Sequence, residues 1–271
     1  MTHLAADLRP IAHAALCLNE APYLKHYRGG FTTWKGVGFT RSSLPGPGFC
    51  FAACLGPSPT LDELIPFARE FFADCQQGWG VLVEADVGHP MEDELKARGW
   101  PINEDEPAYV MPDIRRAGGV SPLLSDEETG GSRPPLAIRL ARTPADETAF
   151  HRVTHDAFQP PPELADSMLP SSSYLPDPEI GLLVGAVDGK DVTVAGFSIS
   201  GPTAVVWGVA TLEAFRGQGY GATVTRAALA EAAARGCRSA ALRSGPKSRP
   251  LYERLGFQYV CNHRTYGPPP A

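Results

Sequence analysis

The stretch from Ala204 to Ala222 constrains this chain more than any other part of its sequence. It opens with the apolar, β-branched run 205–210, whose length and flanking Gly and Pro predict a buried strand. The segment 216–221 follows and reads Arg-Gly-Gln-Gly-Tyr-Gly. The alanine-rich segment 222–235 predicts a helix, because alanine is the strongest helix former. The order is therefore a strand, a glycine-rich turn and the start of a helix.

This order of elements is suited to binding an anion. The first turn of a helix has unpaired N–H groups and the positive end of the helix dipole. Glycines before it let the backbone approach a ligand closely, and Arg216 adds a positive charge. We therefore expect a phosphate site at this turn. The alternative is a plain tight turn packed by glycines.

Two segments carry a resemblance to a known family. The spacing Arg216-x-x-Gly219-x-Gly221 differs from GxGxxG and from the Walker A loop, and resembles the pyrophosphate loop of the GNAT superfamily of N-acetyltransferases. After a predicted strand at 239–244, the run LYERLGF at 251–257 is similar to the last block of the same superfamily. The resemblance implies an α/β (α+β) fold in which a mixed, mostly antiparallel central sheet is flanked by helices, and it implies acetyl-CoA as cofactor.

The resemblance also assigns roles to individual residues. It implies that Tyr252 protonates the departing CoA thiolate, which is reasonable for a phenol of pKa ~10 facing a thiolate of pKa ~8.5. It places the pantetheine arm along the main chain of the predicted strand and the pyrophosphate on the turn that follows. The cofactor-binding residues expected on this basis are Val209, Ala210, Thr211, Arg216, Gly217, Gln218, Gly219, Tyr220, Gly221 and Ala222.

The chain departs from the family pattern in two respects. Many relatives carry Asn at the position of Gly245, so one cofactor contact is missing or replaced here. Superfamily members often place a carboxylate on the strand before the loop, whereas this strand has none and Glu213 reads as an exposed turn residue. The sequence therefore names no general base. An ordered water or a group from the Pro-rich segment 159–178 are both open.

The first half shows the same order of elements as the second. We expect a strand at 49–55, a helix that starts with the capping box Thr60–Glu63 and ends at Gly78, a strand at 79–87, a helix at 90–98 and a strand at 106–111. This order and the nearly equal glycine spacings predict a degenerate internal repeat. The predicted domains are 1–112, a degenerate GNAT-like unit, and 136–271, the catalytic GNAT unit, joined by a Gly-, Ser- and Pro-rich linker at 113–135.

The first half lacks the features that would bind CoA or supply acid. Pro57 and Pro59 remove backbone donors where a phosphate would need them, and Leu95 stands in the position of Tyr252. The second half begins with a strand at 136–140, a helix from Thr143 to about 158, and a meander of strands at 181–187, 192–200 and 202–210. The Pro- and Ser-rich segment 159–178 lines the acceptor site by resemblance.

The helix expected from Thr143 to about 158 carries Glu147, His151 and His155. Their spacing allows a metal pair, but there is no HExxH motif and no fourth ligand nearby. We therefore expect no metal and interpret the histidines as surface or pocket-lining residues.

Composition limits the partners. The chain has 271 residues and a net charge of −6, with residues 136–271 near +1 and the rest near −7. There is no basic stripe with interleaved aromatics, so we expect no nucleic acid. No apolar run approaches the ~20 residues of a membrane span. Six cysteines without a CxxC pair and an N-terminus without a signal pattern predict a cytoplasmic protein.

The expected function is direct transfer of an acetyl group from acetyl-CoA to a primary amine on a small molecule or peptide. The alternatives are a non-catalytic CoA-binding sensor or scaffold, and an acyltransferase for a longer acyl group. The sequence leaves open whether the protein is a monomer or a homodimer.

Overall fold

One sheet of eleven strands runs through the protein. The computed structural model describes residues 3–19, 21–44, 47–75, 78–115, 134–166 and 169–269. In sheet order the strands are β1 (Gly30–Trp34), β2 (Val37–Arg41), β3 (Phe51–Cys54), β4 (Gly80–Glu84), β11 (Gln258–Tyr266), β5 (Ile102–Met111), β10 (Ser239–Arg243), β9 (Thr203–Thr211), β8 (Lys190–Ser200), β7 (Ile180–Val187) and β6 (Ala137–Leu140). Among the strand pairs of the described residues, β3–β4 and β9–β10 are parallel and the others are antiparallel. The predicted mixed, mostly antiparallel sheet flanked by helices is confirmed.

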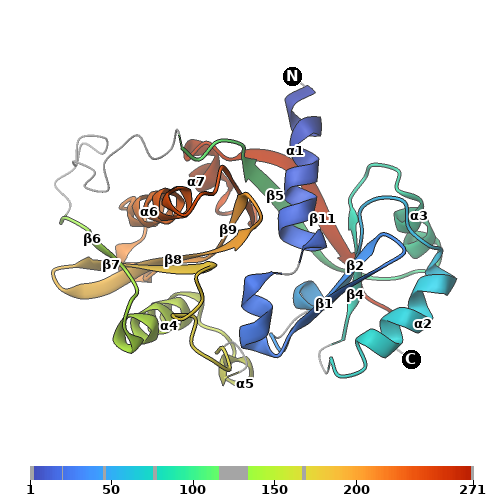
Figure 1. Cartoon of the computed structure of the whole chain (residues 1–271), viewed down its shortest axis with the longest axis horizontal. Helices are drawn as coiled ribbons and strands as arrows, with labels where there is room; N and C mark the ends of the chain where they lie inside the picture. The colour runs from blue at the N-terminus through green and yellow to red at the C-terminus, as the bar shows by residue number, and fades with distance from the viewer. Residues whose placement is uncertain are drawn as a thin grey trace.

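The two halves of the chain share the centre of this sheet. The last strand, β11, lies between β4 and β5 and is antiparallel to both, while β5 also pairs with β10 (Figure 1). Each half thus places its final strand between strands of the other half. Most of the segment expected to be a linker, residues 116–133, lies outside the described residues.

The same run of elements occurs in both halves. In the first, β3 is followed by α2 (Leu61–Phe71), β4, α3 (Pro90–Ala97) and β5; in the second, β9 is followed by α6 (Tyr220–Ala234), β10, α7 (Arg249–Arg254) and β11. The parallel strand pair occupies the same place in each run. This order agrees with the predicted internal repeat.

Helices cover both faces of the second half. The helices α4 (Pro144–Phe158) and α6 lie on opposite sides of β7, β8 and β9 (Figure 1). Val206 and Leu229 belong to the cluster under α6, whereas Val153 and Val194 belong to the cluster under α4. A short helix, α5 (Pro162–Ala165), follows α4. A sheet buried on both faces explains why its strands read as continuous apolar runs.

The helix starts follow local chemistry that the sequence displays. Thr60 and Thr143 each form a capping box, with Glu63 and Asp146 respectively, as the N-cap of α2 and α4. Ser248 is the N-cap of α7 (Arg249–Arg254), but its side chain makes no capping hydrogen bond. Short 3-10 helices lie before β3, at Pro47–Phe49, and between β9 and α6, at Glu213–Phe215.

The first 48 residues contain elements that the sequence analysis did not predict. They are α1 (His3–His13), the π-helix Ala14–Leu18, the 3-10 helix Pro22–Tyr27 and the hairpin β1–β2. The helix α1 packs on β5, β10 and β11 at the centre of the sheet. It therefore contacts strands from both halves. Within the described residues, no helix combines the length and the apolar character needed to cross a bilayer.

Candidate functional site

The glycine-rich segment joins β9 to α6 as predicted. Gly217 and Gly219 have φ angles of 76° and 81°, which L-residues with side chains rarely adopt. Gly219 is the N-cap of α6, so Tyr220, Gly221 and Ala222 form the first turn of this helix. A Cβ on Gly221 would stand 3.4 Å from Thr211 Oγ1, which shows how closely the end of β9 approaches the helix. Gly219 is thus required by its backbone conformation, whereas a methyl group at Gly221 would make an ordinary van der Waals contact.

The start of α6 offers hydrogen-bond donors that the protein does not use. Thr223 N–H donates to Gly219 O, which leaves earlier N–H groups outside the helical pattern. In the part of the chain that the structure describes, the N–H groups of Gly217, Gly219, Gly221 and Ala222 have no acceptor. No side chain caps the helix and no acidic residue lies in its first turn, in contrast to α2 and α4. The positive end of the helix dipole is therefore available to an anion.

Several of the predicted cofactor residues, among them Arg216 and Tyr220, use their side chains for hydrogen bonds within the protein. Arg216 is exposed, and its guanidinium donates to the backbone oxygens of Thr211 and Ala157, which fixes the loop against the end of α4. The ring of Tyr220 is 1% exposed and its hydroxyl donates to Pro134 O. Arg216 therefore contributes a positive charge held in a fixed place, and Tyr220 fixes the backbone at the start of α6.

The strand β9 opens away from β10 beside this loop. The two strands pair only as far as Val205 and Ala241, although β9 continues to Thr211. On its other edge β9 has a bulge opposite β8, where Gly208 has a φ of 60°. A Cβ on Gly208 would approach Phe150 Cζ to 3.2 Å, so only glycine fits here without strain. The backbone of Val209, Ala210 and Thr211 therefore borders an edge that β10 does not cover.

Tyr252 lies on α7 in the cluster that also contains residues from β9 and α6. Its ring centroid is 5.7 Å from Phe257 and 6.5 Å from Tyr109, and the residue is 7% exposed. Val209 and Ala222 pack against the same cluster, so β9, the α6 start and α7 meet there. Burial raises the pKa of the Tyr252 hydroxyl to about 12. The phenol is thus a proton donor that stays protonated at neutral pH.

A wall of aromatic side chains lies on the α4 side of β9. The ring of Tyr174 is 5.6 Å from Trp207 and 5.8 Å from His151, and its hydroxyl donates to Tyr27 Oη at 2.7 Å. Among the described residues, Trp207 Nε1 and His151 Nε2 are both buried and have no hydrogen-bond partner. Such atoms are expensive to leave unpaired, so they mark a place that a ligand or water completes. Sequence reasoning missed Trp207 because a tryptophan on a buried strand reads as core.

Glu147, His151 and His155 do not converge. Glu147 is buried and accepts hydrogen bonds from Ser173 Oγ and Tyr174 N, whereas His155 is exposed next to Asp156. Burial lowers the pKa of His151, an effect that the negative charge of Glu147 partly opposes. Glu147 thus positions the segment at Tyr174, and the burial of His151 favours its neutral form. Glu213 is exposed, as predicted.

A cavity of about 630 Å³ lies at the other end of α6 from the glycine loop. It is lined by residues around the start of β7 and by Arg235, at the C-terminal end of the helix. A helix of this length spans about 22 Å, so the cavity is remote from the unused donors. Arg235 is also held there by the carbonyl oxygens of Pro178 and Ile180, far from any phosphate at the loop.

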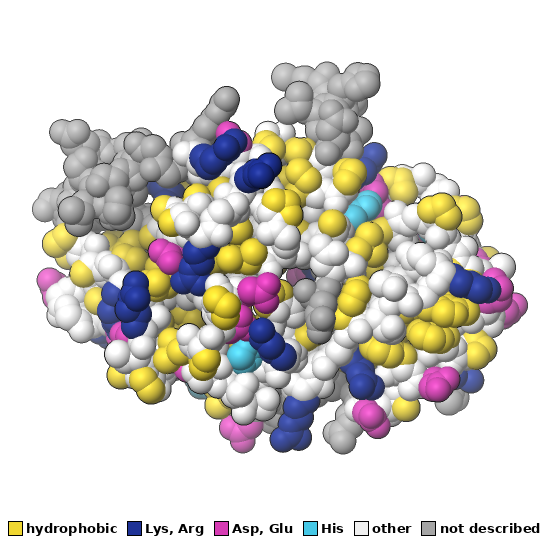
Figure 2. Space-filling view, in the orientation of Figure 1, with side chains coloured by type: hydrophobic (Ala, Val, Ile, Leu, Met, Phe, Trp, Pro, Cys, Tyr) yellow, Lys and Arg dark blue, Asp and Glu magenta, His cyan; other side chains and the backbone are white. Residues whose placement is uncertain are grey.

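Charges are mixed over the face drawn in Figure 2. Lys and Arg side chains alternate with Asp and Glu over both halves, without a continuous basic stripe on this face. Arg243 and Arg249, two of the basic residues that follow α6, contact Leu16 O and Glu253. The side chains of Arg243 and Arg249 are therefore engaged by groups of the protein itself.

Comparison with known proteins agrees with this geometry. Residues 146–257 match the model of the acetyltransferase (GNAT) family. Among solved structures, a GCN5-related N-acetyltransferase from Kribbella flavida has a TM-score of 0.66 at 19% identity, covering 99% of this chain and 95% of that chain. A protein of unknown function from Staphylococcus epidermidis has a TM-score of 0.59 at 15% identity, covering 88% and 93%.

A further structure, a GCN5-related N-acetyltransferase from Sphaerobacter thermophilus, has a TM-score of 0.54 at 15% identity and covers 88% of this chain and 81% of that chain. No curated protein matches the chain in sequence. At these identities the solved structures establish the fold, and the family match establishes the acetyltransferase domain. Residues 146–257 therefore form a domain that matches the GNAT acetyltransferase family, and the fold of the GCN5-related N-acetyltransferases extends over nearly the whole chain.

Proposed function

We propose that this protein is an acetyl-CoA-dependent N-acetyltransferase that passes the acetyl group directly to a primary amine on a small molecule or peptide. The catalytic unit is residues 136–271, and residues 1–112 form a degenerate unit that completes the sheet. The observation that carries the proposal is the start of α6, where several N–H groups are unused and no acidic residue or side-chain cap is present. The diphosphate of CoA would bind these donors.

The neighbouring elements supply the other parts of the reaction. The open edge of β9 at Val209, Ala210 and Thr211 would pair with the amides of the pantetheine arm, and a backbone N–H at the bulge would stabilise the charge on the thioester oxygen. The amine nitrogen attacks the thioester carbonyl carbon and the C–S bond breaks. Tyr252 Oη gives its proton to the departing sulfur.

The attacking amine must also lose a proton. His151 Nε2 is the candidate acceptor, because it is buried, has no hydrogen-bond partner among the described residues and belongs to a histidine whose pKa is lowered by burial. Trp207 Nε1 on the same wall is an unused donor that suits a hydroxyl or carbonyl of the acceptor. The reaction would take place in a reducing cytoplasm, because all six cysteines are free thiols and thiols stay reduced there.

A binding and turnover experiment tests the proposal. Acetyl-CoA binding is measured by calorimetry, and thiol release is measured over a panel of primary amines, for the wild-type chain and Gly219→Glu. The variant puts a carboxylate and a side chain where the diphosphate would bind, so we expect loss of both binding and turnover. Gly189→Glu is the matched control, because Gly189 also has a positive φ of 78°, is exposed and lies in a turn between β7 and β8.

The outcomes separate the proposal from its main alternative. Acetyl-CoA binding without thiol release for any amine would indicate a CoA-binding sensor or scaffold. Equal binding by the wild type, Gly219→Glu and Gly189→Glu would show that the start of α6 is not the cofactor site.

A further inference from the structure

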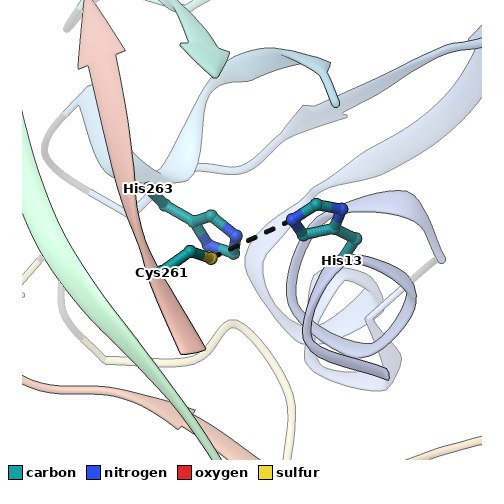
Figure 3. A group of neighbouring side chains, drawn as sticks. All are labelled: His13, Cys261 and His263. Carbon is teal, nitrogen blue, oxygen red and sulfur yellow. Dashed lines mark hydrogen bonds between the residues drawn. The ribbon is translucent and has the colours of Figure 1, made fainter. Parts of the chain in front are cut away.

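A cluster of metal-ligating side chains lies where α1 crosses β11, apart from the site described above. It consists of His13, the last residue of α1, and of Cys261 and His263 on β11. One candidate ligand atom from each residue lies within 4.8 Å of the other two. Figure 3 shows His13 reaching from the helix toward the strand that carries the other two side chains.

The fold explains why these side chains meet. Cys261 and His263 are two residues apart on a strand, so both point to the same face of the sheet, and α1 packs on that face. Glu84 stands opposite His263 on the neighbouring strand β4. Its Oε2 lies 3.3 Å from His13 Nε2. Three elements therefore deliver two imidazoles, one sulfur and one carboxylate to the same place.

The separations suit a small tetrahedral ion. Ligands at ~2.0 Å for nitrogen or oxygen and ~2.3 Å for sulfur stand roughly 3.3 to 3.7 Å apart in a tetrahedral zinc site. His13 Nε2 is 4.0 Å from Cys261 Sγ and 3.3 Å from Glu84 Oε2. Glu84 is near His13 but lies outside the group of three whose ligand atoms are all within 4.8 Å of one another, so its side chain would rotate toward Cys261 and His263 to complete the site.

The hydrogen bonds around His263 also leave one nitrogen for an ion. Its Nδ1 lies 3.5 Å from Cys17 Sγ, whereas its Nε2 is buried and has no partner among the described residues. With Nε2 bound to a metal, Nδ1 would carry the proton and donate to Cys17 Sγ, the arrangement that orients metal-binding histidines. Arg9 Nε lies 2.6 Å from the other oxygen of Glu84 as an ion pair, although neither atom makes a hydrogen bond among the described residues, and its charge would hold this carboxylate in place.

We propose that His13, Cys261 and His263, with Glu84 as the fourth ligand, bind one Zn²⁺ ion that fastens α1 to β11 and β4. Nitrogen and sulfur donors select Zn²⁺ over Mg²⁺ or Ca²⁺, which require oxygen. A thiolate and a carboxylate balance the two charges of the ion. The site has four protein ligands and no open position, so its role is structural.

The test uses the full-length chain. Zinc content is measured by mass spectrometry after purification and dialysis, Zn²⁺ affinity is measured by competition with a chromophoric chelator, and Co²⁺ is added to chelator-treated protein. We expect one Zn²⁺ per chain and, with Co²⁺, an absorption band from thiolate-to-cobalt charge transfer. Cys261→Ser should lose the band and bind Zn²⁺ at least about 10-fold more weakly, because it removes a direct ligand.

Cys237→Ser is the matched control, since Cys237 is a buried cysteine outside the cluster. It should keep the band, the affinity and the stoichiometry. A wild-type chain that shows no cobalt–thiolate band, or Cys261→Ser with unchanged Zn²⁺ affinity, would overturn the proposal. The cobalt spectrum of the wild type decides the question even where Cys261→Ser fails to fold.

Discussion

The hydroxyl of Tyr252 is expected to act only when the thiolate leaves. Replacing Tyr252 with Phe keeps the ring that packs on Phe257 and Tyr109 but removes the proton donor. We expect kcat to fall about 10²-fold, with little change in the KM for acetyl-CoA, because the interaction forms in the transition state. The measurement is steady-state thiol release.

The pH profile provides a second readout of this residue. Since burial raises the pKa of Tyr252 to about 12, its ionisation should cause no loss of kcat in the wild type between pH 6 and pH ~10. Tyr252→Phe with wild-type kcat across this range would remove Tyr252 from the mechanism.

His151 should control the acid side of the profile. Its pKa is lowered by burial, so the neutral base persists to a pH below the usual value of ~6.5 and the acid limb of kcat/KM should lie below that pH. His151→Asn should lower kcat about 10²-fold and abolish this limb. Full activity of the variant at pH 7, with the acid limb retained, would assign the proton transfer to water or another group.

For single residues, the sequence could predict only those roles that belong to a local sequence motif. The turn at Gly219 and the helix at Tyr252 were readable because their neighbours in sequence are their neighbours in space. His13 and Cys261 were not, because 248 residues separate them and only the packing of α1 on β11 brings them together. Trp207 was overlooked since neither strand pattern nor spacing shows that its indole nitrogen lacks a partner.

The start of α4 depends on Asp146. This carboxylate accepts hydrogen bonds from Thr143 N and Oγ1 and pairs with Arg139 Nε at 2.7 Å. The hydrogen bond from Arg139 is the largest cause that lowers the Asp146 pKa, followed by that from Thr143. Because the pKa of this carboxylate is lower in the folded than in the unfolded state, the ionised group stabilises the fold at pH values above the unfolded pKa of ~3.9. This contribution is lost as the pH falls from there through the folded pKa.

Asp146→Asn should therefore lower the free energy of unfolding by about 1 kcal/mol at pH 7 and by less as the pH falls below 4. The measurement is denaturant unfolding of both proteins at several pH values. Asp156→Asn is the control, because Asp156 lies near the other end of α4, where a negative charge opposes the helix dipole. A deficit that stays constant down to pH 2 would contradict the assigned role of the charge.

The strand β11 is held by charges as well as by its ladder. Arg264 contacts Glu92 at 2.8 Å, Asp105 at 2.7 Å and Asp86 at 3.1 Å, which join α3, β5 and the end of β4 to this strand. The side chain of Glu92 is 1% exposed. Arg264→Met would leave that carboxylate buried with less compensation.

We expect Arg264→Met to destabilise the fold by about 3 kcal/mol, measured by denaturant unfolding. Arg115→Met is the matched control, because Arg115 is 68% exposed in its pair with Asp113 and should change stability by less than ~1 kcal/mol. Equal effects of the two substitutions would mean that the network around Glu92 adds nothing beyond a surface pair.

Elements were predictable where caps and periodicity coincide. The capping boxes at Thr60 and Thr143 placed the starts of α2 and α4 correctly, whereas α2 ends at Phe71 and not at Gly78 as expected. The region before residue 49 was not predicted, because Pro10 interrupts the helical pattern and the π-helix after His13 has no sequence signal of its own. Its structure is imposed by packing on β5, β10 and β11, which no local pattern shows.

For the whole molecule, the position of β11 was the feature least accessible to sequence. No pattern in the sequence reveals that the strand extends to Tyr266 and lies between β4 and β5. The residue pattern of a strand does not show which other strands it pairs with. The internal order of both halves predicted two units, and pairing over long sequence distances joins them in one sheet.

This shared sheet predicts that the chain unfolds in a single transition. The backbone hydrogen bonds of β11 to β4 and β5, together with those of β5 to β10, would all be lost if either half unfolded alone. Trp34, Trp79 and Trp100 report on the first half, and Trp207 reports on the second. In a Trp207→Phe chain, fluorescence therefore follows the first half alone while far-UV circular dichroism follows the whole chain. We expect the two signals to give the same denaturant midpoint and the same slope, and two separate midpoints would show that the halves fold as independent domains despite the strands they exchange.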